Sequence, residues 1–258
     1  MMTKVVILAG GFGTRLSEET KKIPKPMVEI GGMPMIWHIM KIFSHQGFND
    51  FIICLGYKGN IIKEFFRDLY MNSSDVTFDL RDNKITFENI KAEPWNVSLV
   101  ETGLYTMTGG RIKRLKEKLG NEAFFVAYGD CVSDVDLNEL LKFHKKKKMK
   151  ATLTSVIPDG RFGVLDINDG IVNSFREKQS SDVGWINGGF MVLEPSVLSY
   201  IKNDDVMLEV GPLGKLAEEG ELAAYQHKGF WKCMDTLKDR NDMEDLWQKD
   251  PKWKIWKE

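Results

Sequence analysis

The sequence has few of the residues that build disulfide frameworks and zinc centres: three cysteines and four histidines among 258 residues. The cysteines, Cys54, Cys131 and Cys233, are odd in number and far apart, so they match neither kind of site. The histidines show no metal-ligand spacing, and we expect structural roles for all four: His38, His45, His144 and His227. The cysteines are therefore expected to be reduced cytosolic thiols.

The chain also lacks an excess of charge and any long apolar run. Lys and Arg total 36, Asp and Glu total 37, and the formal net charge of −1 gives no reason to expect a nucleic-acid partner. No apolar run approaches the ~20 residues that cross a bilayer. The first residues, "MMTKVVILAGG", lack the features of a signal peptide. We expect a cytoplasmic protein with no membrane partner.

Strand-like and helix-like segments alternate through most of the chain. Residues 4–9 and 50–56 are apolar and rich in β-branched side chains, as strands covered on both faces should be. Apolar residues at helical spacing follow in 34–47 and 59–71. The alternation continues through "AFFVAYGD" to "KATLTSVI". This pattern predicts an α/β fold of Rossmann-like type, in which helices flank a mixed, mostly parallel sheet.

Two segments, about 75–102 and 158–194, contain short strands with no helices between them. Turn residues at 82–83 and 168–170 predict hairpins. We expect these segments to be β-hairpin insertions in an otherwise α/β domain.

The chain has no repeat and no Pro/Ser-rich linker. A single domain over 1–240 is therefore expected, followed by a helical tail over 241–258. The tail carries Trp247, Trp253 and Trp256. Three tryptophans in so short a segment predict docking, either on the tail's own domain or on a neighbouring subunit.

A glycine-rich turn follows the first predicted strand in "VVILAGGFGTRL". At Gly10, Gly11 and Gly13 the missing Cβ atoms would let backbone N–H groups approach phosphate oxygens. The turn is not a Walker loop, because Gly13 is followed by "TR" instead of Lys-Ser/Thr. It is not a dinucleotide fingerprint, because Leu16 stands where the third glycine belongs. A tight structural turn remains the alternative.

Two cations near this turn favour the phosphate interpretation. Arg15 offers a fixed fork of donors, which matches phosphate oxygens. Lys25 lies between Pro24 and Pro26, which restrict the backbone on either side of it. Such a set suits a triphosphate whose charge must be neutralised before another anion attacks. The alternatives are a surface salt bridge for Arg15 and plain solvation for Lys25.

With these residues in place the sequence resembles a known family. "LAGGFGTRL" followed by "PKPM" is similar to the sugar-nucleotide pyrophosphorylases, the nucleotidyltransferases that act on sugar 1-phosphates. Further segments fit in order over nearly the whole chain and resemble the cytidylyltransferase branch: "PMVEIGGMPMIWHIM", "EPWNVSLVETG", "MTGGR", "GRFGVLDI", "INGGF" and "FWKCMDTLKD".

The resemblance implies a reaction. CTP and α-D-glucose 1-phosphate would give CDP-glucose and pyrophosphate by in-line attack of the sugar phosphate on the α-phosphorus, with Mg²⁺. It also implies a homo-oligomer. Alternatives are another nucleotide or sugar phosphate, a nucleotide-sensing relative without catalysis, or a nicotinamide-dependent dehydrogenase, which the missing third glycine disfavours.

The resemblance assigns the metal to Asp130 and Asp235, with Arg15 and Lys25 as the catalytic cations. Asp130 ends a predicted strand directly after Gly129, at the edge of an α/β sheet where ligands usually bind. Mg²⁺ prefers oxygen ligands of this kind. The alternatives are a capping or turn role for Asp130 and an N-cap role for Asp235.

The remaining substrate contacts also follow from the resemblance. Glu177, Lys178 and Asn187 are expected to bind the sugar phosphate, and Arg111 a phosphate; an edge-strand salt bridge and turn, and an ordinary helix-start arginine, are the alternatives. The nucleotide is expected to contact a set drawn from the glycine turn, from "VETG" and from the strand before Asp130: Leu8, Ala9, Gly10, Gly11, Gly13, Thr14, Glu101, Gly103 and Gly129.

Three residues depart from the family pattern. Cys131 stands where glycine is more frequent, and Gln179 and Cys233 stand where proline is expected. Cys131 would crowd the metal site or make it sensitive to oxidation. Gln179 would loosen the loop after Lys178. These departures bear on the identity of the sugar more than on the reaction.

Overall fold

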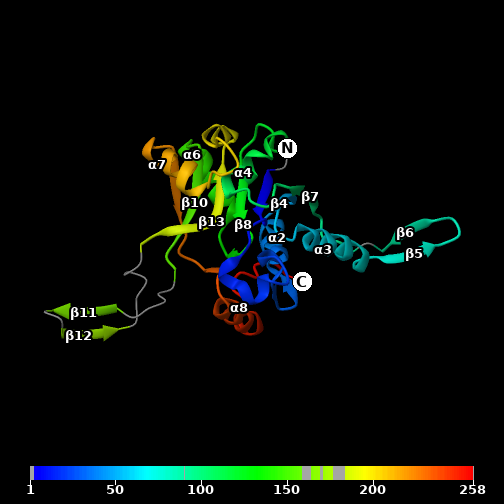
Figure 1. The fold of residues 1–258 in the computed structure, drawn as a ribbon, viewed down its shortest axis with the longest axis horizontal. Coiled ribbons are helices and arrows are strands. Elements are labelled where there is room, and N and C mark those ends of the chain that lie inside the picture. The colour runs from blue at the N-terminus through cyan, green and yellow to red at the C-terminus, as the bar shows by residue number, and fades with distance from the viewer. Residues whose placement is uncertain (1–2, 90, 159–163, 169–170, 177–183, 258) are drawn as a thin grey trace.

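A central seven-stranded sheet organises the molecule (Figure 1). In a computed structural model of the chain, residues 3–89, 91–158, 164–168, 171–176 and 184–257 are described. The strand order is β14 (Leu222–Gln226), β10 (Ala151–Val156), β13 (Ile186–Leu193), β8 (Phe124–Tyr128), β1 (Lys4–Leu8), β4 (Asp50–Leu55) and β7 (Asn96–Glu101).

Strand β1 lies inside this sheet, parallel to β8 on one side and to β4 on the other, and β4 is in turn parallel to β7. Only β13 is reversed, running antiparallel to both β8 and β10, whereas β10 and β14 are parallel. The predicted α/β fold with a mixed, mostly parallel sheet is confirmed.

Alternate side chains of β1 enter two apolar layers, one on each face of the sheet. Val5 and Ile7 pack with residues of the helices that cover one face, and Val6 and Leu8 pack with those of the other face. The first face is covered by α2 (Met35–His45), α3 (Gly59–Asn72), α6 (Leu137–Lys147) and α8 (Leu237–Lys249). The second is covered by α4 (Thr108–Lys113), α5 (Lys116–Leu119), η4 (Pro195–Tyr200), η5 (Glu209–Leu213) and α7 (Gly214–Glu218).

Short elements complete the fold around the sheet. The helical turns are η1 (Thr14–Leu16), α1 (Ser17–Thr20) and η2 (Lys25–Met27). The two-stranded pairs are β2 (Glu29–Ile30) with β3 (Met33–Pro34), β5 (Asp75–Asp79) with β6 (Lys84–Glu88), β9 (Cys131–Ser133) with β15 (Trp231–Cys233), and β11 (Val164–Asn168) with β12 (Ile171–Arg176). No helix in the described part of the chain is both long and apolar enough to cross a membrane.

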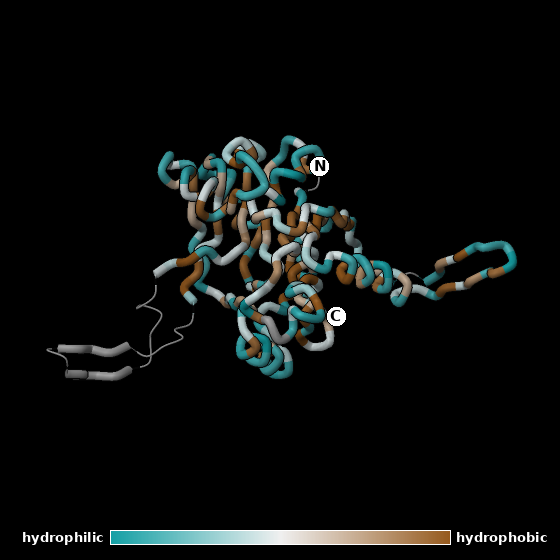
Figure 2. Tube along the Cα trace, viewed as in Figure 1, coloured by the Kyte–Doolittle hydropathy of each residue, from teal (hydrophilic) through white to brown (hydrophobic). Residues whose placement is uncertain are grey.

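The two β-rich segments are each divided between the sheet and a projecting hairpin. Hairpin β5–β6 extends beyond α3, away from the body of the molecule, and β11–β12 extends on the opposite side (Figure 1). Strands β7 and β13, in contrast, belong to the central sheet, where hydrophobic residues concentrate (Figure 2). Only the hairpins are therefore insertions, and the predicted ranges 75–102 and 158–194 were too wide.

The C-terminal tail packs on its own domain. Its helix α8 starts at Leu237, before the predicted boundary, with Thr236 and Asp239 forming a capping box. Beyond α8, Trp253 is fully buried and Trp256 is 6% exposed. Both rings pack against His38 of α2, at centroid distances of 6.1 and 6.3 Å. Of the two alternatives for the tail, the chain's own domain is the one observed.

His38 links α2 to this tail in its neutral form. Its Nε2 is 2.9 Å from the carbonyl oxygen of Ile30, and Trp253 Nε1 donates to its Nδ1 over 3.4 Å. Nδ1 must therefore be unprotonated. Burial lowers the pKa of His38 from 6.5 to about 4, against smaller opposing effects of main-chain hydrogen bonds.

Acid should therefore destabilise the fold through His38. Between pH 6.5 and pH 4 the unfolded chain binds a proton at this ring and the folded chain does not. The contribution of His38 to the free energy of unfolding should fall by about 3 kcal/mol as the pH is lowered from 6.5 to 4. Above pH 6.5 this contribution should not change with pH. Urea titrations at several pH values should show a shallower pH slope in His38→Gln. The exposed His45→Gln on the same helix should keep the original slope, and an unchanged slope in His38→Gln would remove this ring from the account.

Candidate active site

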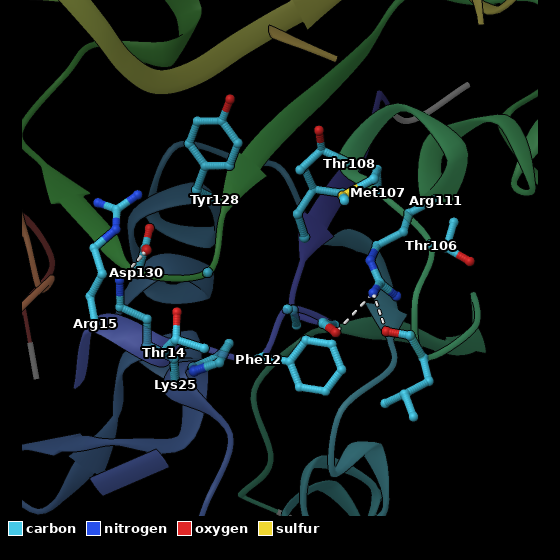
Figure 3. Close-up of a pocket in the computed structure, with 18 of the residues that line it drawn as sticks. Phe12, Thr14, Arg15, Lys25, Thr106, Met107, Thr108, Arg111, Tyr128 and Asp130 are labelled. Atoms are coloured by element: carbon cyan, nitrogen blue, oxygen red, sulfur yellow. Dashed lines mark hydrogen bonds and ion pairs between the residues drawn. The ribbon is translucent and has the colours of Figure 1, made fainter. Parts of the chain in front are cut away.

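A cavity of about 610 Å³ opens where β1 and β8 end (Figure 3). Its size is typical of small-molecule sites. Its lining comes from the glycine turn, from the loop that leads into α4 and from the ends of β8 and β15: Leu8, Ala9, Gly10, Gly11, Phe12, Gly13, Thr14, Arg15, Lys25, Pro26, Leu104, Tyr105, Thr106, Met107, Thr108, Arg111, Tyr128, Gly129, Asp130 and Asp235.

Lys25 joins two carboxylates at one side of this cavity. Its Nζ lies 2.6 Å from Asp130 Oδ2 and 2.8 Å from Asp235 Oδ1. Lys25 starts η2 and is only 9% exposed, Asp130 follows β8, and Asp235 follows β15. The second oxygen of Asp235 accepts from Arg15 Nη1 at 2.7 Å. All four predicted catalytic and metal-ligating residues therefore meet in one cluster.

The carboxylates hold Lys25 charged in spite of its burial. Burial alone would lower the pKa of Lys25, but the charge and hydrogen bond of Asp130 and the hydrogen bond of Asp235 outweigh it and raise that pKa above its usual value. The ammonium is therefore a permanent cation at the edge of the cavity, and plain solvation is excluded for it. Arg15 does make a salt bridge, and its partner is Asp235 of this cluster.

The two aspartates do not play the capping roles considered as alternatives. The N-cap of α8 is Thr236, whose side chain accepts from the backbone N–H of Asp239. Asp235 instead directs its carboxylate to Lys25 and Arg15. Asp130 binds Lys25 through Oδ2 and accepts from Cys131 Sγ through Oδ1 over 3.2 Å.

The glycine turn is shaped by what lies beside each residue. A Cβ on Gly10 would lie 2.2 Å from Arg111 Nη1, so only glycine fits there. Gly13 has a φ of +63°, in the left-handed region that favours glycine. Gly11 differs, because a Cβ there would meet nothing within 4 Å. No contact within the chain requires glycine at position 11. A ligand that comes close to the backbone there would require it.

Arg111 has a structural role in the site, and its expected contact with a phosphate stays a prediction. Its side chain lines the cavity, but Nη1 donates to the carbonyl oxygens of Leu55 (3.1 Å) and Gly103 (2.7 Å), and Nη2 donates to that of Gly10 (2.9 Å). Arg111 is 4% exposed, and burial lowers its pKa. The guanidinium therefore ties the glycine turn to the ends of β4 and β7. Figure 3 shows Arg111 with its bonds to residues that line the cavity.

Two residues expected to contact the base lie outside the cavity lining. Glu101 forms an exposed ion pair with Lys63, at 2.5 Å. Gly103 has a φ of +93° and places its carbonyl oxygen against Arg111. Glu101 is therefore paired with Lys63 outside the cavity lining, and its expected role as an acceptor for the base stays a prediction.

On the sugar side, Asn187 is the one expected residue that the structure describes; Glu177 and Lys178 lie outside the described residues. Asn187 Nδ2 is 3.4 Å from Tyr128 Oη, which donates to Glu209 Oε1 at 2.5 Å. Glu209 Oε2 accepts from Thr108 Oγ1 at 2.8 Å. This chain of hydrogen bonds connects β13, β8, η5 and α4, and two of its members, Tyr128 and Thr108, line the cavity (Figure 3).

The sequence reasoning missed the aromatic part of the cavity. Phe12 lies between the glycines of the turn, 40% exposed, with its ring centroid 5.2 Å from that of Tyr57 and 6.0 Å from that of Tyr105. Tyr105 is 78% exposed. The sequence did offer a clue to Phe12, because a large aromatic residue is unusual inside a glycine-rich turn. Tyr128 offered a similar clue, because it ends the predicted strand directly before Gly129.

The cluster is suited to a polyanion and a divalent cation. Two carboxylates contact a single ammonium group. Their combined negative charge would also attract a divalent cation, for which their oxygens are suitable ligands. Carboxylates are the hard ligands that Mg²⁺ prefers, so Asp130 and Asp235 fit the expected metal. The glycine turn and the two basic side chains, Arg15 and Lys25, line the same cavity. Positioning and neutralisation of phosphate groups are the chemistry that this arrangement supports.

Comparisons with known proteins agree with this geometry. A family model described as nucleotidyl transferase matches residues 4–239. The glucose-1-phosphate cytidylyltransferase of Salmonella typhimurium is 54% identical over 98% of this chain and 99% of its own length. A probable glucose-1-phosphate cytidylyltransferase of Bacillus subtilis is 44% identical over 98% and 100%. A solved UDP-glucose pyrophosphorylase from Acinetobacter baumanii, 19% identical, has the same fold, with a TM-score of 0.69 over 98% of this chain and 96% of that one.

The buried role of Arg111 makes a prediction about stability. Arg111→Met would remove the hydrogen bonds that the buried guanidinium donates to the carbonyl oxygens of Leu55, Gly103 and Gly10 and to Thr102 Oγ1, and we expect the free energy of unfolding to fall by more than about 3 kcal/mol in urea titrations. The control is Arg114→Met on the same stretch of chain, where loss of an exposed pair with Asp204 should change the free energy of unfolding little. If Arg111→Met lost nucleotide affinity at unchanged stability, Arg111 would be a phosphate ligand after all.

Proposed function

The chain belongs to the nucleotidyl transferase family, and from this we propose that it transfers the cytidylyl group of CTP to α-D-glucose 1-phosphate. The products are CDP-glucose and pyrophosphate. The observation that carries the proposal is the cluster of Lys25, Asp130 and Asp235 beside the glycine turn, in a chain 54% identical to a relative of that name.

In the proposed reaction, an oxygen of the sugar phosphate attacks the α-phosphorus of the nucleotide. A new P–O bond forms, the bond between the α-phosphorus and its bridging oxygen breaks, and pyrophosphate leaves with that oxygen. The nucleophile is already an anion, so no strong general base is required. The barrier is mainly repulsion between anions and the cost of orientation.

The residues of the cluster lower both costs. Backbone N–H groups of residues 10–13 are proposed to approach the phosphates, where Gly11 leaves room for them. Arg15 adds a fork of donors, and Lys25 adds a cation that the cluster keeps charged. A bound divalent cation, Mg²⁺ in this proposal, would be held by Asp130 and Asp235 and would neutralise phosphate charge.

The sugar is proposed to lie on the side of Tyr128 and Asn187. Tyr128 lines the cavity, and Asn187 lies within 3.4 Å of its hydroxyl. Asn187 has both a donor and an acceptor to offer to sugar hydroxyls. Glu177 and Lys178 stay predictions for the sugar phosphate. The homo-oligomer and the cytoplasmic location likewise stay predictions.

An assay with each of the four nucleoside triphosphates tests the proposal. The purified chain is mixed with Mg²⁺ and glucose 1-phosphate, and pyrophosphate release is followed. Release should be strongest with CTP and should require both the sugar phosphate and the cation. Binding of CTP with no turnover would mean a nucleotide-sensing protein, and faster release with another nucleotide would contradict the assigned substrate.

Removal of either charge of the central pair should slow turnover. Lys25→Ala leaves two carboxylates facing each other, and Asp130→Asn removes one charge from the cluster. Each should reduce kcat by more than tenfold, which corresponds to over ~1.4 kcal/mol of barrier. The exposed Lys22→Ala is the control and should keep near-normal rates. Near-normal turnover in Lys25→Ala or Asp130→Asn would exclude that residue from the mechanism.

Substitution of Gly11 and of Gly10 should distinguish a glycine needed for function from one needed for the fold. Because a Cβ at Gly11 meets nothing in the chain, Gly11→Ala should unfold at the same temperature as the original protein. Its turnover should nevertheless fall more than tenfold, since the methyl group would occupy the space proposed for phosphate. Gly10→Ala, where the Cβ would collide with Arg111, should lower the melting temperature as well. Full activity in Gly11→Ala would place the phosphates elsewhere.

A further inference from the structure

Two of the three cysteines face each other beside the candidate catalytic carboxylates. Cys131 in β9 and Cys233 in β15 are directly opposite partners in an antiparallel pair of strands. They stand 102 positions apart along the chain. The structure thus brings two distant thiols together as one pair.

The register suits a covalent link between the two sulfurs. One step along the ladder, Met234 N donates to the carbonyl oxygen of Asp130 at 2.9 Å. Because hydrogen-bonded and non-hydrogen-bonded pairs alternate, Cys131 and Cys233 form a non-hydrogen-bonded pair, in which Cα atoms are typically about 4.5 Å apart. This spacing lies within the range that disulfides accept. The two Sγ atoms lie within 4.8 Å of each other, and both cysteines are free thiols.

The pair is coupled directly to the carboxylate cluster. Cys131 Sγ donates to Asp130 Oδ1 over 3.2 Å, and Asp130 holds Lys25 through its other oxygen. Cys233 lies two residues before Asp235, the other partner of Lys25. A bond between the sulfurs would remove the S–H donor of Asp130 and draw together the two strand ends that carry the carboxylates.

The accessibility of the pair is unequal. Cys131 is 4% exposed, whereas Cys233 is half-buried. An oxidant from solvent therefore reaches Cys233 first, and Cys131 is already in place as the resolving thiol. The third cysteine, Cys54, is fully buried inside the central sheet and has no part in this pair.

We propose that Cys131 and Cys233 form a reversible, oxidation-sensitive dithiol whose disulfide form switches off nucleotidyl transfer. A hydroperoxide is the oxidant. The Cys233 sulfur attacks one peroxide oxygen, the O–O bond breaks, and water or an alcohol leaves as Cys233 becomes a sulfenic acid. The Cys131 sulfur then attacks the Cys233 sulfur, the S–O bond breaks, and the hydroxyl group leaves as water with the proton of the Cys131 thiol. The two sulfurs together lose two electrons, which the peroxide gains.

The disulfide acts through the carboxylates and not by blocking the cavity. Neither cysteine lines the cavity, and both adjoin the strand ends that position Asp130 and Asp235. A shift of these carboxylates misplaces the charges that face the phosphates, and small misplacements at such sites cost rate steeply. Reduction by a dithiol restores both thiols and with them the original cluster.

The test uses the full chain with hydrogen peroxide as the probe. After treatment, the intact mass should fall by two hydrogen atoms, and peptide mapping should link Cys131 to Cys233. Pyrophosphate release from CTP and glucose 1-phosphate should fall by more than about tenfold and return on addition of dithiothreitol. Cys233→Ser should keep its basal rate and resist peroxide. The matched thiol control, Cys54→Ala, should remain sensitive.

The activity part of this test rests on the proposed function, whereas the mass measurement does not. A linked peptide in a chain that shows no transferase activity would therefore support the dithiol and count against the proposed function alone. A Cys233 that stops at sulfenic or sulfinic acid, with no link, would overturn the proposal. So would unchanged activity of the linked chain. Peroxide-insensitive thiols together with inhibition by Zn²⁺ would instead identify a thiophilic metal site at Asp130, Cys131 and Cys233.

Discussion

The ammonium group of Lys25 is the contact on which the rest of the site depends. It joins Asp130 and Asp235, which lie 105 and 210 residues further along the chain, and without a cation between them these carboxylates would repel each other. Three segments must therefore converge: η2 and the ends of β8 and β15. Arg111 holds the glycine turn after β1 in place by donating to the carbonyl oxygen of Gly10. The fold positions charge, and charge is what phosphate transfer between anions requires.

Local signals in the sequence were sufficient for much of this architecture. The strand at 4–9, the helix at 34–47 and the glycine turn follow from apolar periodicity and from residues with special backbone freedom, which are properties of neighbouring residues. The position of Asp130 followed from a rule of topology, since ligands bind at the carboxyl ends of parallel strands. The assignment of Lys25, Asp130 and Asp235 to one site came from family resemblance, and the structure brings these three side chains together.

What sequence reasoning missed depends on tertiary contacts. Whether a guanidinium such as that of Arg111 binds phosphate or carbonyl oxygens depends on which loops surround it, and these come from three separate segments. Strand propensity likewise did not reveal that β7 and β13 join the central sheet, because pairing partners are set by the whole topology. The register that places Cys131 opposite Cys233 is equally invisible from spacing along the chain.

A crystal structure of the chain with CTP and magnesium would test the central claim most directly. The account predicts the triphosphate along residues 10–15, with a magnesium ion bound by Asp130 and Asp235 and with Lys25 still in contact with the cluster. A nucleotide bound outside the cavity that begins at the glycine turn, or a magnesium ion held without either aspartate, would contradict it.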